Sequence, residues 1–246
     1  MPTMQGVQVL RGLDVLRDVE QGRVPAAVAR RDKLGELRRR ALAIIRDEGL
    51  LATRACWRVA ALQGKPGAAG WLELDGGRLQ APRLVPASGR LTGVACAVLT
   101  LGAAVTSRID ALFAAREASL ALALDSVANE LLFALSRRVQ DRMVAALARQ
   151  GLCMAGELRA GDPGLALEAH PAVLELAGAA AIDVRLTSTL MMNPPKSTSI
   201  VQGVGLDLPR QTWSRCDGCR SRERCALVND PAYRAAPAAS ALQAAT

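Results

Sequence analysis

Two consecutive prolines, Pro194 and Pro195, constrain the folding of this chain more than any other feature of its sequence. Each proline lacks a backbone N–H and fixes its φ angle, so neither an α-helix nor a central strand can continue through this point. The flanking segments, residues 185–192 and 198–204, are rich in threonine and large apolar residues, which suit half-buried strands. We therefore predict that these two segments form a β-hairpin with its bend at the prolines.

The composition indicates a folded protein rather than a disordered one. Half of the 246 residues are hydrophobic and 22% are charged, which is an ordinary globular balance. The formal net charge of +8 comes almost entirely from arginines spread along the chain, and aromatic residues make up only 2%. Because nucleic-acid bases stack on aromatic side chains, we predict no nucleic-acid partner.

The chain lacks the sequence patterns of an exported or membrane-spanning protein. Charged residues between Arg11 and Asp18 come too early for a secretory signal peptide. The longest uncharged run, residues 91–107, is shorter than the roughly 20 residues that a membrane span needs. We therefore expect a cytoplasmic protein without a membrane span, whose cysteines are reduced or bind metal.

Several segments have clear helix or strand patterns. Residues 94–101 are almost continuously apolar, which predicts a strand buried on both faces. Apolar residues recur at spacings of three and four over residues 32–47 and over a long segment, about residues 117–150, which predicts two amphipathic helices. A further helix is expected over residues 165–176. Residues 64–89 carry many glycines and prolines and predict loops with short strands, at Trp71–Leu74 and Arg83–Val85.

Three cysteines close together, Cys216, Cys219 and Cys225, form the pattern Cys-x2-Cys-x5-Cys. Two thiols separated by two residues can reach one metal ion from a single turn, so we predict that the three bind a metal centre, either iron–sulfur or zinc. A fourth ligand would come from Cys153, His170 or an exogenous group. The alternative is that all three are reduced structural thiols.

Two other residues could have either a structural or a functional role. His170 is the only histidine, so catalytic triads and metal dyads built on several histidines are excluded, and we expect it at the surface or as a helix cap. Asp125 lies at the edge of the apolar stripe of the long helix. It is either a solvated acid or an acid that faces a ligand.

Residues 185–199, RLTSTLMMNPPKSTS, resemble the C-terminal activation (reactivation) domain of cobalamin-dependent methionine synthase. They resemble more closely the free-standing bacterial proteins built from that domain alone, in which a similar cysteine pattern ends the chain. Residues 9–13, 97–102 and 124–130 also resemble this family, so the likeness covers nearly the whole chain. It implies a single α+β domain over residues 1–234, with a twisted antiparallel sheet and long packed helices, followed by a disordered tail.

The resemblance implies a function in corrinoid chemistry. Family members bind S-adenosylmethionine over a corrinoid whose cobalt has become inactive, and support its reductive methylation. An arginine before a Pro-Gly turn holds the methionyl group in the family; here the corresponding loop is Arg159–Gly164, without the family's aromatic residue. The cofactor is expected between this loop and residues 191–197. The implied cofactor-binding residues are Asp125, Arg159, Gly161, Asp162, Gly164, Met191, Met192, Lys196 and Ser197.

Alternative interpretations stay open at this stage. Met191 and Met192 could be core residues, and Lys196 an exposed turn residue. The sequence has no corrinoid-binding Asp-x-His-x-x-Gly pattern, so the cobalamin must be supplied by a partner, a corrinoid protein or a cobalamin-dependent methyltransferase. Whether the chain is itself an enzyme or a component of a methionine synthase-type methyltransferase is undecided. The alternative function is a metal-binding electron-transfer or assembly protein that keeps the fold without binding S-adenosylmethionine.

Overall fold

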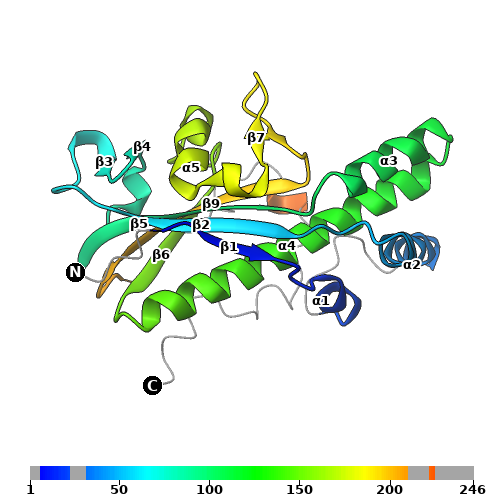
Figure 1. Cartoon of the computed structure of the whole chain (residues 1–246), viewed down its shortest axis with the longest axis horizontal. Coiled ribbons are helices and arrows are strands. Elements are labelled where there is room, and N and C mark those ends of the chain that lie inside the picture. The colour runs from blue at the N-terminus through cyan, green and yellow to red at the C-terminus, as the bar shows by residue number, and fades with distance from the viewer. Residues whose placement is uncertain (1–5, 23–31, 210–221, 225–246) are drawn as a thin grey trace.

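The computed structural model describes residues 6–22, 32–209 and 222–224, and its central feature is a five-stranded sheet of order β1-β2-β5-β9-β6 (Figure 1). Every neighbouring pair in this sheet is antiparallel. The predicted fold class, α+β with an antiparallel sheet and long packed helices, is confirmed. The predicted cysteine centre (Cys216, Cys219 and Cys225) and the predicted tail (residues 235–246) lie outside the described residues.

The sheet strands are β1 (Gln8–Arg11), β2 (Arg54–Ala61), β5 (Arg90–Thr100), β6 (Cys153–Leu158) and β9 (Ser197–Leu206). The short strands are β3 (Trp71–Leu74), β4 (Gly77–Gln80), β7 (Arg185–Leu186) and β8 (Met192–Asn193). The α-helices are α1 (Leu16–Glu20), α2 (Asp32–Asp47), α3 (Ala104–Ala114), α4 (Ala118–Ala148) and α5 (His170–Ala177). The 3-10 helices are η1 (Ala68–Gly70), η2 (Pro82–Leu84), η3 (Leu167–Ala169), η4 (Ala179–Ile182) and η5 (Arg222–Arg224).

Strand β5 is buried on both faces, as its apolar sequence predicts. Ala95, Ala97 and Leu99 belong to a core shared with α4, whereas Val94, Cys96 and Val98 alternate with them and belong to a second core shared with α5. Strand β9 is likewise buried from Ser197 to Gly205. The protein therefore has three layers, with the sheet between the long helix α4 on one side and α5 with the short strands on the other (Figure 1).

Helix α4 covers one face of the sheet over most of the length of the molecule. It has 31 residues, close to the predicted segment 117–150, and its apolar stripe packs into the first core together with α1, α2 and α3. Among the described residues it is the one helix long and apolar enough to cross a membrane, and half of its most apolar window is buried inside the protein. The apolar side of α4 is therefore accounted for by its packing in the protein core.

The opposite face differs from the sequence predictions in three places. The helix predicted over residues 165–176 begins as η3, and α5 starts only at His170, with Pro171 in its first turn. Strand β3 is confirmed, but it pairs with β4, which the sequence analysis missed. The strand predicted at Arg83–Val85 is wrong, because Pro82 begins the 3-10 helix η2 there and cannot donate to a strand ladder.

The predicted hairpin of residues 185–192 and 198–204 is also wrong. Strand β9 pairs with β5 and β6, whereas β7 pairs only with β8. Residues 187–191 form a tight turn instead of a strand: the N–H of Thr187 donates to Met191 O, and the N–H of Leu190 donates to Thr187 O. Threonine hydroxyls can bond to nearby backbone and favour such turns, and Thr187 Oγ1 accepts the N–H of Met191.

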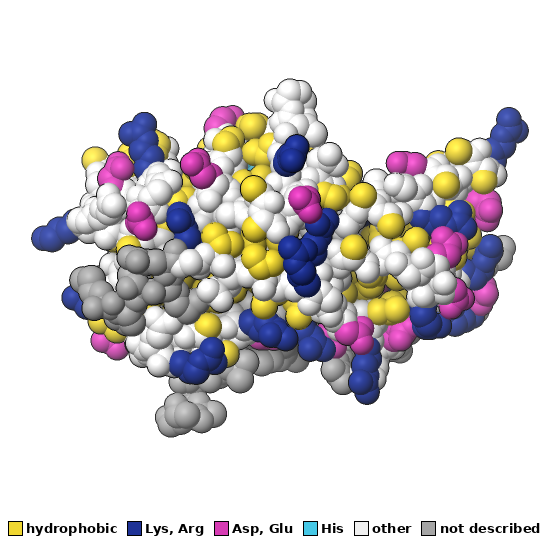
Figure 2. Space-filling view, in the orientation of Figure 1, with side chains coloured by type: hydrophobic (Ala, Val, Ile, Leu, Met, Phe, Trp, Pro, Cys, Tyr) yellow, Lys and Arg dark blue, Asp and Glu magenta, His cyan; other side chains and the backbone are white. Residues whose placement is uncertain are grey.

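Two ion pairs connect α4 to the N-terminal helices. Arg138 donates to both carboxylate oxygens of Asp18, at 2.7 and 2.8 Å. Arg38 donates to Glu130 at 2.7 Å, and the Glu130 side chain is only 1% exposed. On the face shown in Figure 2, basic and acidic side chains of the described residues are interspersed. Of the described ion pairs, these two place a carboxylate in the core and so matter most for stability.

We predict that Arg38→Met destabilises the protein by about 3 kcal/mol, because the buried Glu130 carboxylate would lose the charged hydrogen bonds that Arg38 donates to it. The neighbouring Arg39 forms an exposed pair with Glu36, so Arg39→Met is the matched control and should change stability by less than about 0.5 kcal/mol. Urea unfolding followed by circular dichroism measures both. Equal effects of the two substitutions would contradict the assigned role of the Arg38–Glu130 pair.

Candidate functional site

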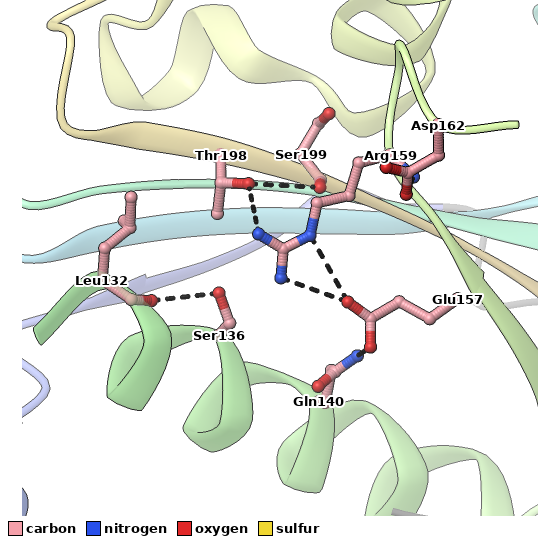
Figure 3. Close-up of polar contacts among 8 residues, drawn as sticks. All are labelled: Leu132, Ser136, Gln140, Glu157, Arg159, Asp162, Thr198 and Ser199. Atoms are coloured by element: carbon pink, nitrogen blue, oxygen red, sulfur yellow. Dashed lines mark hydrogen bonds and ion pairs between the residues drawn. The ribbon is translucent and has the colours of Figure 1, made fainter. Parts of the chain in front are cut away.

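The candidate site begins where the outer strand β6 ends. The register of β6 against β9 shifts between Ala155 and Leu158, so that residues 156 and 157 together lie opposite Gln202. This is a β-bulge, which bends a strand and redirects its side chains. Glu157 in the bulge and Arg159 after it both face α4, as Figure 3 shows.

The Arg159 guanidinium is hydrogen-bonded to Thr198 and to Glu157 (Figure 3). Nη1 donates to Thr198 Oγ1 at 3.0 Å, while Nε and Nη2 donate to Glu157 Oε1 at 3.4 and 3.1 Å. The other carboxylate oxygen of Glu157 accepts a hydrogen bond from Gln140 Nε2 of α4 at 2.9 Å. The side chains of Arg159 and Glu157 are 20% and 29% exposed, so solvent reaches this ion pair.

The loop after Arg159 has a fixed turn geometry. Asp162 Oδ2 accepts the backbone N–H of Arg159, and the N–H of Asp162 donates to Arg159 O, both at 2.9 Å. Gly161 and Gly164 have φ angles of +94° and +97°, which side chains other than glycine rarely adopt. Three of the predicted cofactor-binding residues, Gly161, Asp162 and Gly164, thus form the turn that fixes the backbone next to Arg159.

Lys196 and Asp125 form a second polar group at the start of β9. Lys196 Nζ lies 2.7 Å from Asp125 Oδ1 and donates to Asn129 Oδ1 at 2.8 Å. Asp125 and Asn129 are four residues apart on α4, so both reach the same lysine. The Asp125 side chain is 43% exposed and that of Lys196 13%, which makes Asp125 a partly solvated acid with an internal partner.

The remaining predicted residues have different environments. The Ser197 hydroxyl is buried and lies within hydrogen-bond distance of both Thr100 Oγ1, at 2.8 Å, and Pro194 O, at 2.6 Å, which holds the bend before β9. Met191 is 61% exposed on the β7–β8 turn, whereas Met192 packs against the second core. The structure therefore brings Arg159, Ser197, Lys196 and Asp125 to the first residues of β9, and their roles as ligands of a cofactor stay predictions.

His170 is buried, so its predicted surface position is wrong. Its side chain connects α5 with two other segments: Nδ1 lies 2.9 Å from Leu190 O, and Nε2 lies 3.4 Å from Ser199 Oγ. Loss of solvation on burial lowers the pKa of His170 below its ordinary value of 6.5, and the hydrogen bond to Leu190 opposes this only in part. Its role is to fasten the β7–β8 turn to the sheet.

We predict that His170 makes stability depend on pH. The folded-state pKa lies below the unfolded value of 6.5, so the unfolded chain binds more protons and stability falls as pH drops through this range. Between pH 7.5 and 5, wild-type stability should fall relative to His170→Gln by up to about 1.4 kcal/mol per pH unit. Urea unfolding across this pH range measures the difference, and parallel profiles for the two proteins would contradict it.

The described cysteines differ in their availability to a metal. Burial raises the pKa of Cys56 and of Cys96 to about 12, which keeps both thiols protonated as core residues. Cys153 Sγ donates to Gly205 O and accepts the N–H of Leu208, both at 3.3 Å. Within residues 6–22, 32–209 and 222–224, no group of three metal-ligating side chains is present.

Sequence analysis missed Glu157, Gln140 and Thr198, which surround Arg159. Gln140 precedes Glu157 by 17 residues, and Thr198 follows Arg159 by 39 residues. Contacts between residues so far apart in the chain leave no local pattern in the sequence. The one local signal was Glu157-Leu-Arg159, two opposite charges on alternate residues at the end of an apolar segment. In a strand, alternate residues share a face, so this spacing was compatible with a pair.

Comparison with known proteins relates the chain to one fold. No family model matches the chain, and no curated protein matches it. Among solved structures, the crystal structure of the MetH reactivation domain bound to AdoHcy is similar, with a TM-score of 0.63 and 14% sequence identity. The match covers 85% of this chain and 81% of that chain. The chain therefore has the fold of the MetH reactivation domain.

Proposed function

We propose that this chain binds S-adenosylmethionine and acts as an accessory protein of a corrinoid methyltransferase system. The fold supports the proposal, because the similar MetH reactivation domain was crystallised with AdoHcy. The observation that carries it furthest is the position of Arg159. Its partly exposed guanidinium is fixed by Thr198 and Glu157 beside a rigid turn, as recognition of a ligand carboxylate requires.

The proposed reaction asks the protein for positioning rather than covalent chemistry. A sulfonium is an activated methyl donor, and transfer of its methyl group to reduced cobalt leaves S-adenosylhomocysteine. The protein must hold the amino-acid part and the nucleoside so that the methyl group faces the acceptor. Arg159 would hold the ligand carboxylate, and the backbone of the Gly161–Gly164 turn would line the ligand, since backbone groups at turns commonly serve this purpose.

We further propose that the cobalamin is carried by a partner protein, because the sequence has no corrinoid-binding motif of its own. The partner would meet the protein at the start of β9, where Arg159 and Lys196 lie. Met191, which is 61% exposed on the adjoining β7–β8 turn, offers apolar surface for that contact. Exclusion of water from this contact would favour methyl transfer over side reactions.

Isothermal titration calorimetry with S-adenosylmethionine and S-adenosylhomocysteine tests the proposal. The wild-type protein should bind both, and Arg159→Ala should weaken binding by about 1.5–3 kcal/mol, the usual contribution of a charged hydrogen bond. Arg142 lies exposed on α4 and provides the control, since Arg142→Ala removes the same charge without touching the site. If wild-type protein gives no binding heat at millimolar ligand, the proposed function is wrong.

We also propose a metal centre at Cys216, Cys219 and Cys225, on the sequence pattern alone. Such a centre would let the chain carry electrons for the reduction of cobalt. Iron–sulfur suits this purpose better than zinc, because zinc is not redox-active. Protein purified without oxygen should contain near-stoichiometric iron or zinc, and Cys219→Ser should remove it. Cys96→Ala alters a buried, protonated thiol and should leave the metal content unchanged. Wild-type protein free of both metals would refute the centre.

A further inference from the structure

Glu157 is a charged residue of the site to which neither the sequence analysis nor the proposed function gives a contact with the ligand. Its carboxylate receives hydrogen bonds from two elements: Gln140 of α4 donates to Oε2 at 2.9 Å, and Arg159 donates to Oε1 at 3.1 and 3.4 Å (Figure 3). Gln140 and Thr198, the other neighbours of this pair, are both 7% exposed. Two buried polar side chains thus orient one partly exposed ion pair.

The geometry of this ion pair is looser than that of a purely structural one. Charge-assisted N–H···O bonds are usually about 2.7–2.9 Å long, and the Arg138–Asp18 pair of this protein has such distances. The two Arg159–Glu157 contacts are longer, at 3.1 and 3.4 Å. A partly exposed ion pair contributes little to stability, and the burial of Gln140 and Thr198 beside it is compensated by their hydrogen bonds to the pair. The arrangement is better explained by a requirement for position than by stability.

We propose that Glu157 binds the α-ammonium group of the ligand while Arg159 binds its carboxylate, so that the end of β6 recognises the zwitterion of an amino acid. This inference rests on the proposed function and extends it to a residue that sets specificity. Gln140 is then a positioning residue, because its hydrogen bond aims the Glu157 carboxylate. Opposite charges two residues apart on one strand face present complementary groups to the two ends of a zwitterion.

The charge pattern also predicts which ligands the site rejects. An isolated arginine would attract any carboxylate, but Glu157 beside it repels an anion that carries no accompanying cation. A ligand with an ammonium and no carboxylate can still bind to Glu157. A nucleoside without either group has no interaction with the pair and should not respond to changes in it.

Three adenosine compounds separate these interactions in calorimetric titrations. S-Adenosylhomocysteine carries both charged groups, decarboxylated S-adenosylhomocysteine carries only the ammonium, and 5′-methylthioadenosine carries neither. Glu157→Gln should weaken binding of the first two by about 10- to 100-fold, the range expected for a lost charged hydrogen bond, and change methylthioadenosine binding by less than about twofold. Glu175→Gln on the exposed face of α5 makes the same change in net charge and should affect none of them.

The outcomes distinguish this inference from the proposed function. Unchanged or tighter binding of S-adenosylhomocysteine to Glu157→Gln, with wild-type binding intact, would overturn the role of Glu157 alone, because Glu157 would then only compete with the ligand carboxylate. Absence of binding to the wild-type protein would overturn both proposals. Thermal unfolding of each variant verifies folding, and Glu157→Asp, which keeps the charge on a shorter side chain, should bind the ammonium ligand better than Glu157→Gln.

Discussion

Burial of the central sheet on both faces is the constraint from which the placement of the polar residues follows. Strands β5 and β9 lie between two apolar cores, so a charged side chain in the middle of either strand would lose its hydration without compensation. The charged side chains of the candidate site accordingly lie outside the middle of these two strands. Lys196 precedes β9, Arg159 follows β6, and Glu157 lies at the bulge of that outer strand.

The first three residues of β9 show how such an end is organised. Ser197 bonds to Thr100 and to the proline bend, Thr198 accepts a hydrogen bond from Arg159, and Ser199 lies next to His170. Three consecutive hydroxyl side chains thus contact three different parts of the chain, two of them on opposite faces of the sheet. A shift of this strand end would therefore change contacts with Arg159 after β6, with α5 and with the proline bend before β9.

Patterns that depend on one segment were predictable from the sequence, and patterns that depend on pairing were not. The 31 residues of α4 and the continuous burial of β5 follow from long, unambiguous apolar periodicity. The hairpin prediction failed because strand propensity at residues 185–192 does not reveal which strand is the partner, and because Thr187 favours a turn. Arg159 was identified through a family resemblance; Glu157 was not, since the residues that orient it come from distant parts of the chain.

The bulge in β6 decides which face of the sheet each later side chain points to, because successive side chains of a strand alternate between the two faces. Counted in strict alternation from Met154, which packs against α4, Leu158 would point to the same side, and Glu157 and Arg159 to the opposite side. The extra residue at positions 156–157 reverses this alternation, so Leu158 packs in the second core and Glu157 and Arg159 point toward α4. In a relative of this protein, deletion of Gly156 would remove the bulge, and strict alternation would then keep Glu157 and Arg159 on the α4 side. Loss of the bulge without a deletion would carry both charged residues to the α5 side. Insertions and deletions in this strand are therefore more informative about the site than substitutions are.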